Sequence, residues 1–123
     1  MALQDKYLEE TAKALSNESY SLPSHVAISN QDSSVGVTAN SLTNEIGSRL
    51  ASNSNRNDDT VSYEAVRSST DVVDTTNGDT IEEIGFFDAS SGGDMLTFDD
   101  IPSIEQTIDF DVDITKNVTP ERK

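Results

Sequence analysis

The sequence has no cysteine, and only eight of its 123 residues are basic. Without cysteine no disulfide can stabilise the fold, and the redox state of the compartment cannot be inferred from a residue that is absent. The eight basic residues stand against 23 acidic ones, which gives a formal net charge of −15. A nucleic-acid partner is therefore disfavoured, because binding to a phosphate backbone requires clustered lysine and arginine, and the sequence has no such cluster.

Apolar residues are also scarce, at 33% of the chain. At this length we expect a single domain, residues 1–123, with a small core. Ordering a residue costs about 1–2 kcal/mol of conformational entropy, whereas burial returns roughly 25 cal/mol per Å² of apolar surface. A thin core leaves little margin, so we expect a homo-oligomer to bury further surface.

Long apolar runs are missing as well. No stretch approaches the roughly 20 apolar residues that span a bilayer. Residues 1–16 lack a basic flank followed by a continuous apolar segment, which is the pattern of a signal peptide. We therefore expect no membrane insertion.

The acidic residues are mainly aspartate, 14 against nine glutamates, and lysine is rare. So large a charge repels itself at low salt, where the Debye length is about 30 Å, and much less at molar salt, where it is about 3 Å. This composition resembles that of proteins from extreme halophiles. The alternative is an ordinary acidic protein, or an acidic, partly disordered cellular protein that interacts with others.

The first 18 residues predict an amphipathic helix. Apolar residues recur at helical spacing and share one face, while charged residues lie elsewhere around the cylinder. These apolar residues are Leu3, Tyr7, Leu8, Ala12 and Leu15. The face either packs on the chain's own sheet or docks on a neighbouring subunit. Pro23 breaks the helix, because proline lacks the amide hydrogen.

Residues 19–116 read as a β-rich module around one hairpin. Ile81–Phe87 and Met95–Phe98 supply its strands, and the turn cluster at 88–94 contains Gly92 and Gly93. Ile84 is expected to face the core. Gly85, Gly92 and Gly93 are expected to serve as structural turns.

The other elements follow from alternation and from polar stretches. Strands are expected at 25–29, 61–67 and 107–115, a short helix or extended chain at 38–47, a mobile loop or strand connection at 48–60, and a loose tail at 117–123. Pro102 is expected to separate the hairpin from the last strand. The sequence thus predicts an α+β, mainly β fold: an antiparallel sheet or small sandwich of about five or six strands with one N-terminal amphipathic helix.

No catalytic, cofactor or metal site is indicated, and we expect no enzyme. The D-x-D-x-D run at 109–113 begins like a calcium loop, but Ile114 stands where that loop requires glycine and Pro120 where it requires glutamate. The only histidine, His25, lacks a nucleophile motif to activate.

Several short blocks resemble a known module. They are Leu22–Ile28 (LPSHVAI), Leu42–Ile46 (LTNEI), Ile81–Asp88 (IEEIGFFD) and the closing alternation Ile108–Ile114. In these blocks and in their order, residues 8–116 resemble the module at the start of tail-collar fibre proteins and related virion proteins of tailed viruses. The resemblance implies a virion protein that assembles into a ring or spike with copies of itself and with other virion proteins. The acidic composition further indicates that the virus infects a halophilic host.

Members of that family often continue into a long fibre, whereas this chain ends at Lys123. We therefore expect a tail adaptor (collar, baseplate or fibre attachment) or a capsid turret or spike. The expected subunit interface is Leu3, Tyr7, Leu8, Leu15 and Phe87. The alternative function is a module that binds a host-surface receptor through its loops at 30–40, 52–60 and 88–94.

Overall fold

The computed structural model describes residues 2–19, 21–31, 36 and 39–119, with the side chains of residues 2 and 3 excepted. This part of the chain contains one α-helix and eight strands in two antiparallel sheets, so the expected α+β, mainly β fold is confirmed. The elements are β1 (Ala2–Leu3), α1 (Asp5–Leu15), β2 (His25–Ser29), β3 (Glu45–Ala51), β4 (Asn53–Asn57), β5 (Thr60–Arg67), η1 (Ser69–Asp71), β6 (Asp79–Phe87), β7 (Met95–Gln106) and β8 (Val112–Val118).

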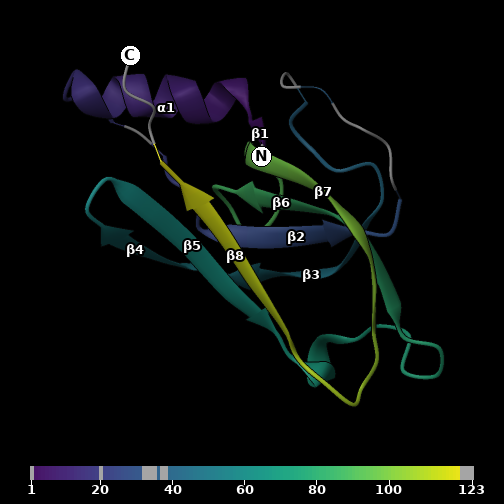
Figure 1. Ribbon diagram of the computed structural model, residues 1–123. Coiled ribbons are helices and arrows are strands. Elements are labelled where there is room, and N and C mark those ends of the chain that lie inside the picture. The colour runs from purple at the N-terminus through teal and green to yellow at the C-terminus, as the bar shows by residue number, and fades with distance from the viewer. Residues whose placement is uncertain (1, 20, 32–35, 37–38, 120–123) are drawn as a thin grey trace.

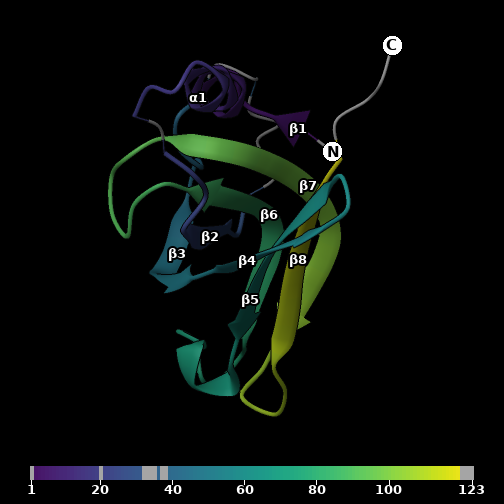
Figure 2. The ribbon, with the colours of Figure 1, turned by 90° about the vertical axis from the view of Figure 1, so that its left-hand side faces the viewer.

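The two sheets pack as a small sandwich. The larger sheet has the order β1-β7-β6-β2-β3 and the smaller has the order β4-β5-β8. Helix α1 lies across one end of the sheets, and the short helix η1 and the β7–β8 connection lie at the opposite end (Figure 1, Figure 2). Ser52 alone separates β3 from β4, so the chain passes almost directly from one sheet to the other.

The core has two parts, one on each side of the larger sheet. Alternation along β2 sends Val26 and Ile28 to one face and Ala27 to the other. The part between the sheets consists of Val26, Ile28, Tyr63, Ala65, Ile81, Phe86, Ile114 and Val118. The part on the outer face of the larger sheet consists of Ala27, Leu42, Phe87, Met95 and Phe98.

The predicted hairpin is present, but its second strand is longer than expected. Phe87 pairs with Met95, and β7 continues past Pro102 to Gln106. The register shifts between Ile81 and Glu83, and the irregular segment of β7 holds the exposed Pro102. A bulge is one of the few places in a sheet that tolerate proline, because no ladder hydrogen bond is lost there.

The structure resolves the ambiguous middle of the chain as strands. The segment that offered either a short helix or extended chain is extended from Glu45, where β3 begins. The expected loop at 48–60 instead holds the end of β3 and all of β4, whose side chains are exposed. Strand β4 is held by backbone pairing with β5 and buries no apolar side chain, so its sequence carries no strand pattern.

The expected last strand is displaced towards the C-terminus. Ile108 and Phe110 lie in the β7–β8 connection and are 52% and 43% exposed. Strand β8 continues to Val118, so the tail expected at 117–123 does not begin at Asn117. The inward side of β8 carries Lys116, whose Nζ lies 2.8 and 2.7 Å from the two carboxylate oxygens of Asp99 on β7. This ion pair links the two sheets.

Candidate interaction surface

Tyr7 attaches helix α1 to the sandwich. Its hydroxyl lies 2.9 Å from that of Tyr63, and the two rings meet edge to face with centroids 6.3 Å apart. Tyr63 is buried in the core between the sheets. Burial, and then the hydrogen bond with Tyr7, raises the pKa of Tyr63 well above its usual value. The Tyr63 hydroxyl therefore stays protonated at physiological pH.

Glu10 fixes the chain that follows the helix. Its Oε2 accepts a hydrogen bond from Ser21 N at 2.7 Å, and its Oε1 lies 3.4 Å from Lys13 Nζ. The bond from Ser21 N lowers the pKa of Glu10; burial opposes this shift, and Lys13 adds to it. The inner face of α1 is thus held by the contact between Tyr7 and Tyr63 and by the hydrogen bond from Ser21 N to Glu10.

The outer face of α1 exposes leucine. Leu8 is 56% and Leu15 is 86% exposed, and the exposed Ala12 lies between them. The spacing of four and then three residues places all three side chains on one stripe of the helix. We call Leu8, Ala12 and Leu15 the outer stripe. Of the helix residues expected at a subunit interface, Leu8 and Leu15 are open, Tyr7 is engaged within the chain, and the side chain of Leu3 lies outside the described part.

Charges beside the outer stripe are locally balanced. The helix carries two lysines and three acidic residues, a net charge of −1 on 11 residues. Glu9 lies 3.6 Å from both Lys6 and Lys13. Exposed pairs of this kind contribute little to stability, but they reduce repulsion towards another acidic surface.

Phe87 was expected at the subunit interface, and that expectation is wrong. Its side chain is 0% exposed within the single chain and packs in the outer part of the core. The Arg49 guanidinium lies over the ring, with its Cζ 3.7 Å from the centroid. Ile84 does face the core between the sheets, as expected, but its side chain is only half-buried.

Arg49 also clamps the turn of the hairpin. Its Nη1 donates to the carbonyl oxygens of Ala89 at 3.0 Å and Gly92 at 2.7 Å, and its Nε donates to Glu45 Oε1 at 2.7 Å. Gly92 and Gly93 have φ angles of +61° and +68°, so they are turn residues as expected. The clamp makes this loop a fixed part of the larger sheet.

Gly85 is not a turn residue, contrary to expectation. It lies inside β6 opposite Phe98. A Cβ atom there would approach Met95 Sδ to 2.8 Å and the Phe87 ring to 3.2 Å. The position is glycine because two large side chains close over the strand at this point.

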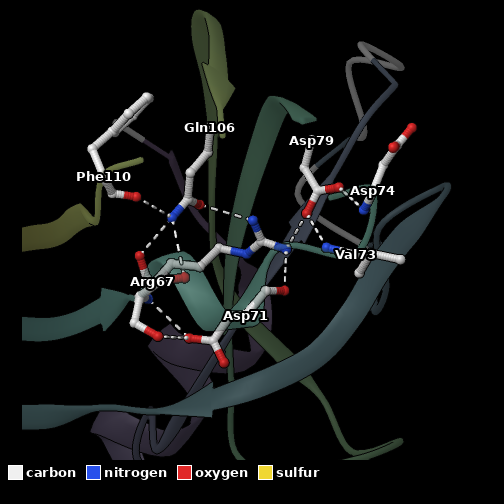
Figure 3. Close-up of polar contacts among 8 residues, drawn as sticks. Arg67, Asp71, Val73, Asp74, Asp79, Gln106 and Phe110 are labelled. Atoms are coloured by element: carbon white, nitrogen blue, oxygen red, sulfur yellow. Dashed lines mark hydrogen bonds and ion pairs between the residues drawn. The ribbon is translucent and has the colours of Figure 1, made fainter. Parts of the chain in front are cut away.

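A buried ion pair closes the end of the sandwich opposite α1 (Figure 3). Arg67 Nη2 donates to Asp79 Oδ2 at 2.6 Å, and both side chains are less than 5% exposed. The same carboxylate accepts backbone hydrogen bonds from Val73 N at 2.8 Å and Asp74 N at 3.0 Å. Burial raises the pKa of Asp79, but these two bonds and Arg67 outweigh that effect and hold the pKa below its usual value.

Gln106 completes this cluster. Its Oε1 accepts from Arg67 Nη1 at 2.8 Å, and its Nε2 donates to the carbonyl oxygens of Arg67 at 2.7 Å and Phe110 at 3.2 Å (Figure 3). Arg67 Nη2 also reaches the Asp71 carbonyl oxygen at 3.1 Å. We call Arg67, Asp79 and Gln106 the latch. It joins the end of β5 to the start of β6 and the end of β7, and its burial leaves no access for a ligand.

The aspartates of the D-x-D-x-D run and His25 do not form a metal site. Asp109 and Asp111 lie in the β7–β8 connection, where Asp111 Oδ1 accepts a hydrogen bond from Ser69 N at 2.8 Å, and Asp113 lies on β8. His25 Nδ1 lies 2.9 Å from Ser24 Oγ. Among the described residues, no group of three or more His, Cys, Asp or Glu side chains is arranged to hold a metal ion.

No helix in the described part of the chain has both the length and the apolar character needed to cross a bilayer. No protein-family model matches the sequence, and comparisons with curated proteins and with solved structures found no match either.

Proposed function

We propose that this protein is a structural protein of a tailed virus, a small adaptor or surface decoration of the virion that assembles with copies of itself. The virion setting rests on the resemblance to the tail-collar module. Self-assembly rests on one observation, the exposed Leu8 and Leu15 on the outer face of α1.

The outer stripe suits an antiparallel pair of α1 helices about a twofold axis. In that arrangement Leu8 of one copy meets Leu15 of the other, and Ala12 lies near the axis. Burying a leucine side chain fully contributes about 1.5–3 kcal/mol. The locally balanced charge of the helix keeps repulsion low at this contact, whereas salt must screen the remainder of the acidic surface.

Light scattering in about 1 M salt tests the assembly, because the Debye length is then about 3 Å. The mass is expected to exceed the 13.3 kDa of one chain. The double variant Leu8→Ser/Leu15→Ser is expected to return it to the monomer value. Val73→Ser is the matched control, since Val73 is 62% exposed on another part of the surface. A wild-type monomer at both low and molar salt would refute self-assembly through α1.

Mass spectrometry of virions purified from the host tests the setting. Cleavage after arginine at 56 and 67 releases the peptide NDDTVSYEAVR, residues 57–67, which is a convenient reporter. We expect this peptide to co-purify with the virion in constant ratio to the major capsid protein. Its presence only in the soluble lysate would contradict a virion role and leave the assembly result intact.

A further inference from the structure

The outer face of the smaller sheet carries a second candidate binding surface, separate from α1. The register places Asn53, Glu64 and Thr115 opposite one another across β4, β5 and β8. Val66 and Asp113 form the adjoining pair. Residues directly opposite in a sheet share a face, so all five side chains point outward together, and all five are exposed.

These five side chains line a concavity of about 560 Å³. Ala51, at the crossing from one sheet to the other, forms part of its wall, and Ala65 and Ile114 complete the lining. Val66 is 53% exposed, so it and Ala51 present a small apolar patch beside the polar groups.

Hydrogen bonds between side chains in the adjoining rows of the sheet fix the shape of this face. Ser62 Oγ donates to Asn117 Oδ1 at 2.6 Å, and the hydroxyls of Thr60 and Thr119 lie 2.6 Å apart. The first contact joins β5 to β8, and the second joins β5 to Thr119, the residue that follows β8. Side chains on paired strands lose little freedom when a ligand binds, and this preorganisation favours affinity.

The lining groups define the chemistry of the ligand. Glu64 and Asp113 only accept hydrogen bonds, whereas Asn53 and Thr115 both donate and accept. In the described part of the chain, no lysine or arginine forms an ion pair with either carboxylate. A fitting ligand presents many hydroxyl donors, some acceptors and a C–H face, and carries no negative charge. We propose that this concavity binds a neutral saccharide.

Weak affinity is expected, because β4, β5 and β8 place no aromatic ring on this face for a sugar to stack on. The site shares only Asn53 with the segments 30–40, 52–60 and 88–94 that were expected to contact a host receptor. Residues 53–57 are strand β4, and the loop at 88–94 is clamped by Arg49. Residues 32–35 and 37–38 of the third loop lie outside the described part.

Titration of the isotope-labelled protein with cellohexaose and with mannohexaose, followed by NMR in about 1 M salt, tests this proposal. At about 10 mM ligand even a millimolar affinity approaches saturation. We expect shifts confined to amides of β4, β5 and β8 for at least one of the two hexamers. A hexamer of galacturonic acid is expected to bind more weakly, because each C6 carboxylate replaces a hydroxyl donor and cannot donate a hydrogen bond to Glu64 or Asp113.

Two double variants distinguish binding through specific hydrogen bonds from a general effect of removing negative charge. Glu64→Gln/Asp113→Asn is expected to weaken hexamer binding at least about tenfold, because two acceptors of the sugar hydroxyls are replaced. Asp58→Asn/Asp59→Asn removes the same charge from the exposed β4–β5 turn and is expected to leave binding within about twofold. Absence of shifts with both neutral hexamers, equal binding of the uronic acid, or equal loss in the two double variants would each overturn the proposal.

Discussion

Arg67→Met is expected to lower the free energy of unfolding by about 3–5 kcal/mol, because it leaves the Asp79 carboxylate buried without its cation. The substitution also removes the donor to Gln106 Oε1 and to the Asp71 carbonyl oxygen. Denaturant unfolding in about 1 M salt measures the change with surface repulsion screened. Arg56→Met is the control, because Arg56 lies on the exposed strand β4, and it is expected to change stability by less than about 0.5 kcal/mol.

The latch also predicts a dependence on pH. The pKa of Asp79 is lowered in the folded protein, so its contribution to stability is complete above the unfolded value of about 3.9. That contribution is lost as the pH falls through the folded pKa. Asp79→Asn is expected to reduce stability at neutral pH and to flatten the fall below about pH 4. If Arg67→Met cost less than about 1 kcal/mol, the latch would not stabilise the sandwich as described.

Phe87→Ala is expected to cost about 3–5 kcal/mol of stability, which is the range for deleting a fully buried phenylalanine. The ring fills the space beneath Arg49 and against Met95 and Phe98. Ile84→Ala is the comparison, because Ile84 lies three residues away on β6 and is half-buried. It is expected to cost less, about 1–2 kcal/mol, because less apolar surface returns to water.

This order reverses the one expected from the sequence, in which Phe87 served assembly and Ile84 the core. Denaturant unfolding of the two variants measures folding, and light scattering measures assembly. If Phe87→Ala kept its stability but lowered the assembled mass, the phenylalanine would belong to a contact between subunits after all. If both variants lost equal stability, the difference in burial would not govern this strand.

The elements recognisable from sequence are those that bury apolar side chains with a regular period. Alternation predicted β5, and β-branched and aromatic residues around a glycine turn predicted the β6–β7 hairpin. Strand β4 escaped prediction because its five side chains are all exposed. The last strand was predicted to begin too early because Ile108 and Phe110 continue the alternation of β8. Both residues lie in the β7–β8 connection, which buries neither side chain.

The candidate surfaces were predictable only in part. The spacing of Leu8 and Leu15 places them together on a helix, whichever way that helix faces. The concave face of the smaller sheet depends on the pairing of β4 and β8 with β5, which brings Asn53 beside Glu64 and Glu64 beside Thr115. Local periodicity does not indicate which strands pair with one another, so this face could not be predicted from the sequence.

The sequence by itself determined the fold class, the acidic character and the N-terminal amphipathic helix, because composition and local period decide these properties. Only the tertiary structure decided which face of each element is covered. It placed Phe87 inside, paired Lys116 with Asp99 across the sheets and buried Arg67 against Asp79. A charged or aromatic residue looks the same in the sequence whether its side chain faces water or contacts a residue distant in the chain. Only the packing of the folded chain distinguishes these two environments.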